Sequence, residues 1–120
     1  HRRVTRDGAY MAAVLASGAD AALSHRSAAA LWGISPYSGR IEVTVPSPRR
    51  KDHPCIACRS SLHPDEITEE RGIPVTTVAR TLLDLGAVLN EDQLEKAIRE
   101  AEFLRLFDLL ELTARSGWTA

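Results

Sequence analysis

Two cysteines and two histidines stand close together near the middle of this 120-residue chain. Cys55 and Cys58 are separated by two residues, and the nearby histidines are His53 and His63. A Cys-x-x-Cys pair with two imidazoles is a ligand set that structural zinc sites use. The residues around the cysteines have the pattern of a strand, however, which places the two sulfur atoms on opposite faces. The pattern therefore favours two independent cysteines over a zinc site or a redox pair, and we predict no metal site.

A second group of reactive side chains comes earlier, where Ser24, His25 and Ser27 lie within four consecutive positions. Neighbouring residues of a helix diverge, and no Gly-x-Ser-x-Gly turn surrounds these serines, so a nucleophile is not indicated. His25 is either a neutral structural histidine, which the positive end of a helix favours, or a ligand-contacting one. Phosphate-binding glycine loops and suggestively paired carboxylates are absent from the sequence. We predict no catalytic residue and no cofactor, and we do not expect this chain to be an enzyme by itself.

The charge of the chain is nearly balanced, with a net charge of −1, so total charge does not indicate a nucleic-acid-binding protein. The basic residues are nevertheless clustered. We predict contacts with DNA phosphates from two groups, at the start of the chain and in a proline-rich segment: Arg2, Arg3, Arg6, Arg49, Arg50 and Lys51. The chain has no apolar run of the roughly 20 residues that a membrane span needs and no secretion signal, which predicts a soluble cytoplasmic protein.

The periodicity of the sequence predicts one α+β domain over residues 1–120, which we expect to be a fragment of a longer protein. A helical hairpin is expected over 7–33, with Asp7 and Ser24 as N-caps and Gly33 ending the second helix. A small, mostly antiparallel sheet of three to four strands follows over 40–75, with Glu42 on its exposed face. Helices over 77–115 complete the domain. These helices are expected to begin at Thr76 or Thr77, at Asn90 with Gln93, and at Asp108. On the second of them, ion pairs from Glu95 to Arg99 and from Lys96 to Glu100 are expected on the solvent side.

Four segments in this order resemble the core domain of bacterial proteins related to the AbiEi antitoxins of abortive-infection toxin–antitoxin systems. The resemblance covers about residues 4–114, and it is carried by Ser24–Gly33, Ile41–Pro46, Arg59–Ser60 and Gly72–Asp84. It implies an N-terminal winged-helix DNA-binding domain before this region and, in many relatives, a very-short-patch-repair-like endonuclease domain after it. The polar residues that the resemblance carries into this chain are His25, Arg26, Arg59 and Arg80, and Asp84 is placed to pair with Arg80.

The chain departs from the family pattern at Cys58, where relatives tend to have histidine, and at His63, where they favour proline. These departures weaken the zinc interpretation further. The resulting hypothesis is a non-catalytic regulatory domain of an antitoxin-type transcriptional regulator that assists DNA binding or toxin neutralisation, with DNA and a cognate toxin as its partners. The alternative is a scaffold domain that positions a fused nuclease on DNA. For the polar residues, a buried network that ties helices to the sheet is the favoured interpretation over a ligand site.

Overall fold

A computed structural model of the chain describes residues 2–18, 20–36, 40–45, 56–59 and 62–106, without the side chains of 2–5 and 56–59. The elements are, in chain order, α1 (Arg2–Ser17), β1 (Ala22–Leu23), α2 (His25–Trp32), β2 (Glu42–Val45), β3 (Ile56–Arg59), the 3-10 helix η1 (Pro64–Glu66), β4 (Ile67–Glu70), β5 (Ile73–Thr76), α3 (Val78–Leu85) and α4 (Glu91–Phe103). None of the helices within these ranges combines the length and the apolar character that crossing a bilayer requires.

The strands form a single mixed sheet in the order β3-β2-β1-β5-β4. β1 pairs antiparallel with β2 and parallel with β5, β2 pairs parallel with β3, and β4 pairs antiparallel with β5. The predicted α+β class is confirmed. The sheet has five strands and is less antiparallel than predicted, because the central strand β1 has only two residues and the connection after β2 is long enough to return the chain to a parallel start.

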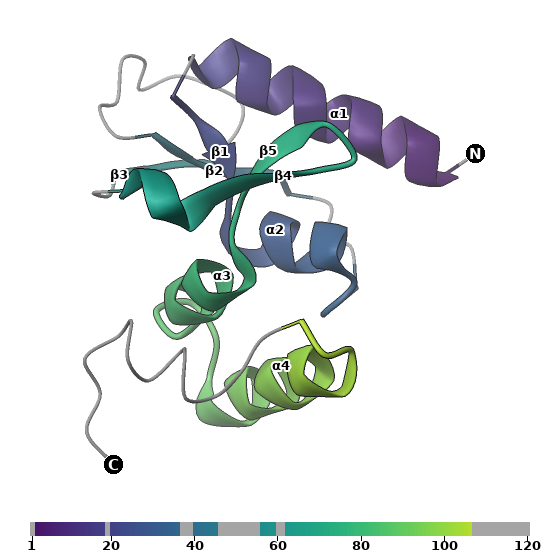
Figure 1. Cartoon of the computed structure of the whole chain (residues 1–120), viewed down its shortest axis with the longest axis vertical. Helices are drawn as coiled ribbons and strands as arrows, with labels where there is room; N and C mark the ends of the chain where they lie inside the picture. The colour runs from purple at the N-terminus through teal and green to yellow at the C-terminus, as the bar shows by residue number, and fades with distance from the viewer. Residues whose placement is uncertain (1, 19, 37–39, 46–55, 60–61, 107–120) are drawn as a thin grey trace.

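Helices cover both sides of this sheet (Figure 1). α1 crosses one side, and α2, α3 and α4 lie on the other. The predicted hairpin over 7–33 is therefore corrected: both helices exist, but β1 lies between them and α1 packs on the sheet. The physical reason is that Ala22 and Leu23 are fully buried as the middle strand, which a helix-to-helix turn would leave at the surface.

Two apolar cores stabilise the layers. In the first, Tyr10 and Val14 of α1 pack against a row formed by Leu23, Val43 and Val75 of three adjacent strands. The second joins α2 and the segment after it to α3 and α4, and its buried members include Ala29, Ile34, Leu82, Leu85 and Ala97. Trp32 contacts both cores, and its indole Nε1 donates to the carbonyl oxygen of Thr76 at 2.9 Å. Trp32 of α2 therefore packs in both cores and links them.

Local capping signals place most helix ends correctly. Thr77 is the N-cap of α3 and accepts from the backbone N–H of Arg80, while Asn90 and Gln93 form the predicted capping box at α4. The prediction for α1 was wrong, because the helix begins at Arg2 and the carboxylate of Asp7 instead accepts from Nε of Arg71 at 2.7 Å. A helix beginning at Asp108 falls outside the described residues.

The end of α2 depends on a left-handed glycine. Gly33 has φ of 83°, and its N–H closes the last turn on Ala29 and Ala30. An added side chain would strain this conformation, so we expect Gly33→Ala to lower the free energy of unfolding by about 1 kcal/mol. Gly8→Ala is the matched control: Gly8 is exposed inside α1 with open space around it, and alanine should stabilise there by about 0.5–1 kcal/mol. Urea denaturation measures both, and effects of the same sign would contradict the role assigned to Gly33.

Candidate functional site

The chain passes directly from β1 into α2, and this junction carries the first polar group of the site. Ser24 is extended and fully buried, whereas the next residue, His25, has φ of 52° and an exposed fraction of 8%. A left-handed histidine is uncommon and costs roughly 1 kcal/mol. Its Nδ1 lies 2.8 Å from the hydroxyl of Ser24, so this hydroxyl bonds the imidazole and does not cap the helix. The turn also brings the imidazole within electrostatic range of Asp84 on α3.

Glu42 of β2 replaces Ser24 as the cap of α2. Its Oε1 accepts from the backbone N–H of Arg26 at 2.7 Å, and its own N–H donates to the hydroxyl of Ser27 at 2.9 Å. The Glu42 side chain is only 6% exposed. A carboxylate at a helix N-terminus is favoured by the partial positive charge of the unpaired N–H groups there. The buried charge is thus stabilised by α2 itself.

The guanidinium of Arg26 completes this arrangement. Nη1 donates to Oε2 of Glu42 at 3.2 Å, and Nη2 donates to the carbonyl oxygen of Val88 at 2.9 Å. Val88 lies in the turn between α3 and α4, so one side chain joins β2, α2 and that turn. The Arg26 side chain remains 40% exposed and forms the solvent-facing end of the group.

A second group of charges lies on α3. Nε of Arg80 donates to Oδ1 of Asp84 at 2.9 Å, and this is the ion pair that the i,i+4 spacing predicts. Nη1 of Arg80 also donates to an oxygen of Glu66 at 3.3 Å, which ties α3 to the end of η1. The side chains of Arg80, Asp84 and Glu66 are 14%, 11% and 19% exposed. This pairing is better shielded from water than a surface salt bridge.

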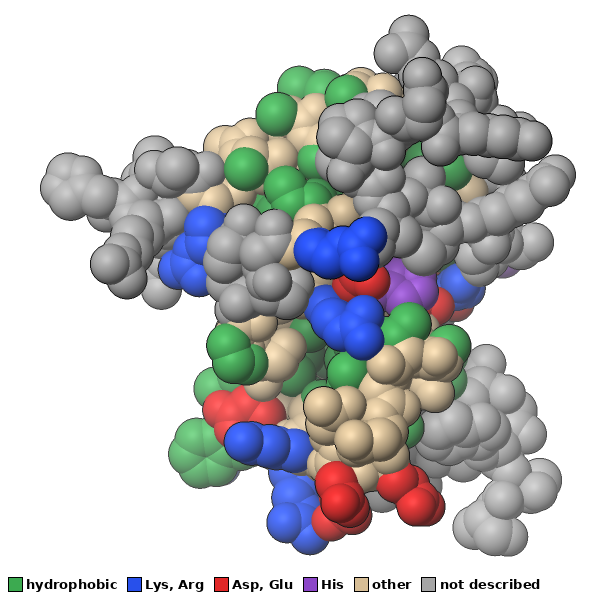
Figure 2. Space-filling model, turned by 180° about the vertical axis from the view of Figure 1, so that it is seen from behind, with side chains coloured by type: hydrophobic (Ala, Val, Ile, Leu, Met, Phe, Trp, Pro, Cys, Tyr) green, Lys and Arg blue, Asp and Glu red, His purple; other side chains and the backbone are tan. Residues whose placement is uncertain are grey.

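Asp84 connects the two groups electrostatically. Burial raises the pKa of its carboxyl, while electrostatic interactions with Arg80 and then with His25 oppose that rise. Its second oxygen, Oδ2, is buried without a hydrogen-bond partner among the described residues. We define the polar cluster by the six residues that these contacts and charges bring together, namely His25, Arg26, Glu42, Glu66, Arg80 and Asp84. Figure 2 shows basic, acidic and histidine side chains meeting on one face of the molecule.

Four of the five residues predicted as a polar site therefore come together: His25, Arg26, Arg80 and Asp84. Arg59, the fifth, stands on β3 in register with Val45, and its side chain is outside the described residues. The charges of the cluster are largely satisfied by one another and by backbone groups. Such an arrangement can hold helices on a sheet and orient one arginine toward solvent. The Ser24 hydroxyl that contacts Nδ1 of His25 is fully buried.

Two members of the cluster were missed. Glu42 was predicted on an exposed face, but all four residues of β2 are buried, because helices cover both sides of the sheet. A glutamate inside an apolar strand indicates a charge-paired residue once helices are known to cover both faces of the sheet, because a buried carboxylate must have a partner. Glu66 follows His63-Pro64-Asp65 in a short turn, and no local pattern indicates that it reaches Arg80.

The predicted DNA-contacting residues are only partly visible. Arg2 and Arg3 belong to α1 without described side chains, and Arg49, Arg50 and Lys51 lie outside the described residues. Arg6 is half-buried and lines a small depression together with Asp7, Glu70 and Arg71. Because acids and bases alternate there, this end of α1 has a mixed charge character rather than a purely basic one.

The predicted cysteine and histidine group is likewise divided. Cys58 pairs with Thr44 in the sheet, while His53 and Cys55 fall outside the described residues. His63 is exposed, and its Nδ1 accepts from the N–H of Asp65 as the N-cap of η1. Within the described ranges, no group of three or more histidine, cysteine, aspartate and glutamate side chains is placed to hold a metal ion.

Comparisons with protein-family models, with curated proteins and with solved structures give no match for this chain.

Removal of the Glu42 carboxylate tests its central role. Glu42→Ala leaves the Arg26 N–H and guanidinium without their acceptor, and we expect the free energy of unfolding to fall by about 2–3 kcal/mol, less than for a fully buried pair because Arg26 can turn to water. Glu95→Ala is the control, since Glu95 forms an exposed ion pair with Arg99 worth less than about 0.5 kcal/mol. If urea denaturation gave the same loss in free energy of unfolding for Glu42→Ala and Glu95→Ala, the Glu42 carboxylate would have no special role in stabilising the fold.

The raised pKa of Asp84 predicts a pH dependence of stability. As the pH rises through the range between the unfolded and folded pKa values, the unfolded chain releases the Asp84 proton first, so ionisation costs stability. The difference in free energy of unfolding, wild type minus Asp84→Asn, should therefore decrease as the pH rises from about 4 to 7. A series of denaturation curves over this range measures it. An increase in this difference with pH would contradict the expected sign.

Proposed function

We propose that this chain is a non-catalytic, cytoplasmic regulatory module of an AbiEi-like antitoxin-type regulator that contacts DNA through the basic connection 46–55. The support from sequence is the ordered resemblance across about residues 4–114. The support from the described residues is the place where this connection leaves and rejoins the sheet. A cognate toxin is the second partner that the resemblance suggests.

The parallel pairing of β2 and β3 is the observation that carries the DNA proposal. Because Val45 pairs with Arg59 and Glu42 pairs with Ile56, the chain leaves at one end of the strand pair and re-enters at the other. The intervening segment holds Arg49-Arg50-Lys51 and connects β2 to the edge strand β3. A tethered segment loses less conformational entropy on binding than a free tail. Arg59 of β3 stands in register with Val45, the last residue before this segment.

The other charged regions fit a supporting role. The polar cluster is largely buried and internally paired, so its charges are committed to the fold. Arg2, Arg3 and Arg6 are near the opposite end of α1 from the start of β1, a distance of roughly 20 Å for a helix of this length. Arg6 also lies beside acidic residues. We therefore assign the main phosphate contacts to Arg49, Arg50 and Lys51, and secondary ones to the start of α1.

Fluorescence anisotropy with a labelled random-sequence duplex tests the assignment. We expect wild-type binding at a salt concentration of about 50 mM that weakens steeply as salt is added. Replacing Arg49, Arg50 and Lys51 by alanine should reduce the slope of log K against log salt by about 2–3, because each lost phosphate contact removes about 0.9.

The matched control removes three exposed positive charges at α4, in the variant Lys96→Ala/Arg99→Ala/Arg105→Ala. It has the same net charge as the test variant and should retain wild-type binding. No binding of the wild type at low salt would reject DNA contact by this chain. Equal weakening in both variants would show that only net charge matters, and DNA binding unaffected by the loss of 49–51 would favour the alternative of a domain that positions a fused nuclease.

A further inference from the structure

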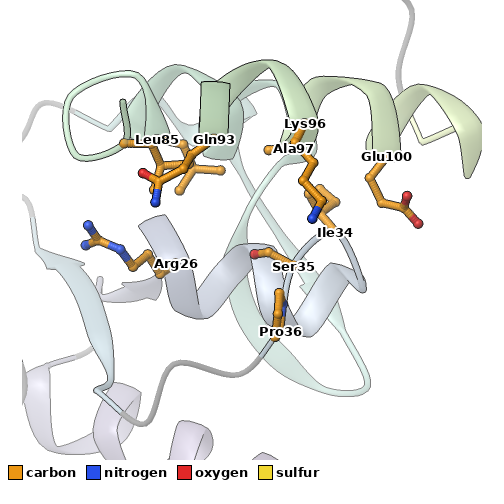
Figure 3. A pocket seen from close by; sticks show the side chains of 10 residues that line it. Arg26, Ile34, Ser35, Pro36, Leu85, Gln93, Lys96, Ala97 and Glu100 are labelled. Atoms are coloured by element: carbon orange, nitrogen blue, oxygen red, sulfur yellow. The ribbon is translucent and has the colours of Figure 1, made fainter. Parts of the chain in front are cut away.

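One flank of α4 borders a groove of about 360 Å³ that separates this helix from the segment after α2. From α4, the groove is lined by Ala97 and by three polar side chains, which Figure 3 shows as Gln93, Lys96 and Glu100. The ion pair predicted between Lys96 and Glu100 does not form among the described residues, and both side chains line this groove instead. This flank of α4 is therefore mainly polar.

On the other side of Ala97, α4 is apolar. Leu94 and Ile98 lie one turn apart there, and both stay half-buried although they pack against the second core. Leu94 reaches the end of α3, because a Cβ added at Gly86 would lie 3.8 Å from Cδ2 of Leu94 and 3.2 Å from the carbonyl oxygen of Leu83. The side chain of Leu83 is likewise half-buried against this core. Leu83, Leu94 and Ile98 thus form an apolar surface, the α3–α4 face, which the described residues cover only in part.

The chain reverses its direction directly after α4. Arg105 has φ of 58°, and the N–H of Leu106 donates to the carbonyl oxygen of Ala101 at 3.0 Å, which is the hydrogen bond of a left-handed helix end. Figure 1 shows this reversal at the yellow end of α4. Leu106 packs against the second core and is half-buried there. The segment that follows Leu106 therefore begins beside the core to which the α3–α4 face belongs.

The sequence of that segment, Phe-Asp-Leu-Leu-Glu-Leu over 107–112, has the apolar side chains that the α3–α4 face needs. In the helix that the sequence predicts here, Leu109 and Leu112 lie one turn apart with Leu110 beside them, while Glu111 and Arg115 fall on the opposite side. Six helical residues span about 9 Å, and the seven residues of α4 from Ala101 back to Leu94 span about 10 Å. The segment is therefore long enough to run along the whole face.

We propose that residues 107–112 dock on the α3–α4 face as a short helix antiparallel to α4. Leu109 and Leu112 pack against Leu83, Leu94 and Ile98, and their burial completes the second core. The occupant is this segment rather than a separate protein, because a covalently linked segment acts at an effective concentration on the order of millimolar. This docking is independent of DNA contact through 46–55, and it makes 107–112 part of the module rather than a linker.

NMR of the wild-type chain with labelled methyl groups tests the docking directly. We expect nuclear Overhauser contacts from the methyl groups of Leu109 and Leu112 to those of Leu94 and Ile98. The absence of these contacts, or contacts with Ile34 across the groove instead, would overturn the proposal. A mixture of labelled and unlabelled chain separates contacts within one chain from contacts between two. Contacts found only between chains would make a second copy the occupant and would also overturn it.

Two variants of the segment measure what the docking contributes. Leu109→Ser/Leu112→Ser removes the docking side chains, and we expect it to lower the midpoint of urea denaturation by about 1 M. Its amide shift changes outside the segment should centre on residues 83, 94 and 98. Glu111→Ser/Arg115→Ser is the matched control, because it places the same residue on the opposite side of the helix and keeps the net charge of the chain. The same change of midpoint in both variants, or shift changes centred elsewhere, would contradict the docking.

Discussion

The buried carboxylate of Glu42 is the constraint on which the arrangement of this molecule depends. It lies in a strand whose two faces are covered, so it must find its partners within the protein. Its partners are the backbone N–H of Arg26, in the first turn of α2, and the guanidinium of the same residue. These bonds fix the position and the orientation of α2 relative to β2. Isolated helices as short as α2 are unstable, and here a charge from another element supplies the missing cap.

The remaining elements follow from the place of α2. Trp32, at its C-terminal end, bonds the end of β5 and packs in both cores, while Arg26, near its N-terminal end, bonds the turn before α4. The Arg80–Asp84–Glu66 group joins α3 to η1, the short helix that directly precedes β4. Polar contacts thus position the three helices of this side, and apolar burial supplies most of the stabilisation between them. We infer that the charged network serves to select one packing of these helices, whatever its net contribution to stability.

Features set by neighbouring residues could be predicted from the sequence. Gly33 ends a helix, and Asn90 with Gln93 begins one, because these residues act on backbone groups within four positions. Features set by distant residues could not. A two-residue strand has no period to recognise, and the burial of Glu42 and the reach of Glu66 to Arg80 depend on which elements cover the sheet. The polar site was anticipated in part through a family resemblance, whereas two of its acidic members, Glu42 and Glu66, required the topology.

The parallel pairing of the central strand also has a consequence for the order of folding. Leu23 of β1 is in register with Val75 of β5, roughly fifty positions later in the chain. During synthesis, α1 and the first strands leave the ribosome with their apolar face uncovered, because the strand that completes the middle of the sheet has not yet been made. Long-range pairings of this kind form late and slowly. We therefore expect the first half of the chain to have no stable fold of its own, and the module to fold as a unit after β5 emerges.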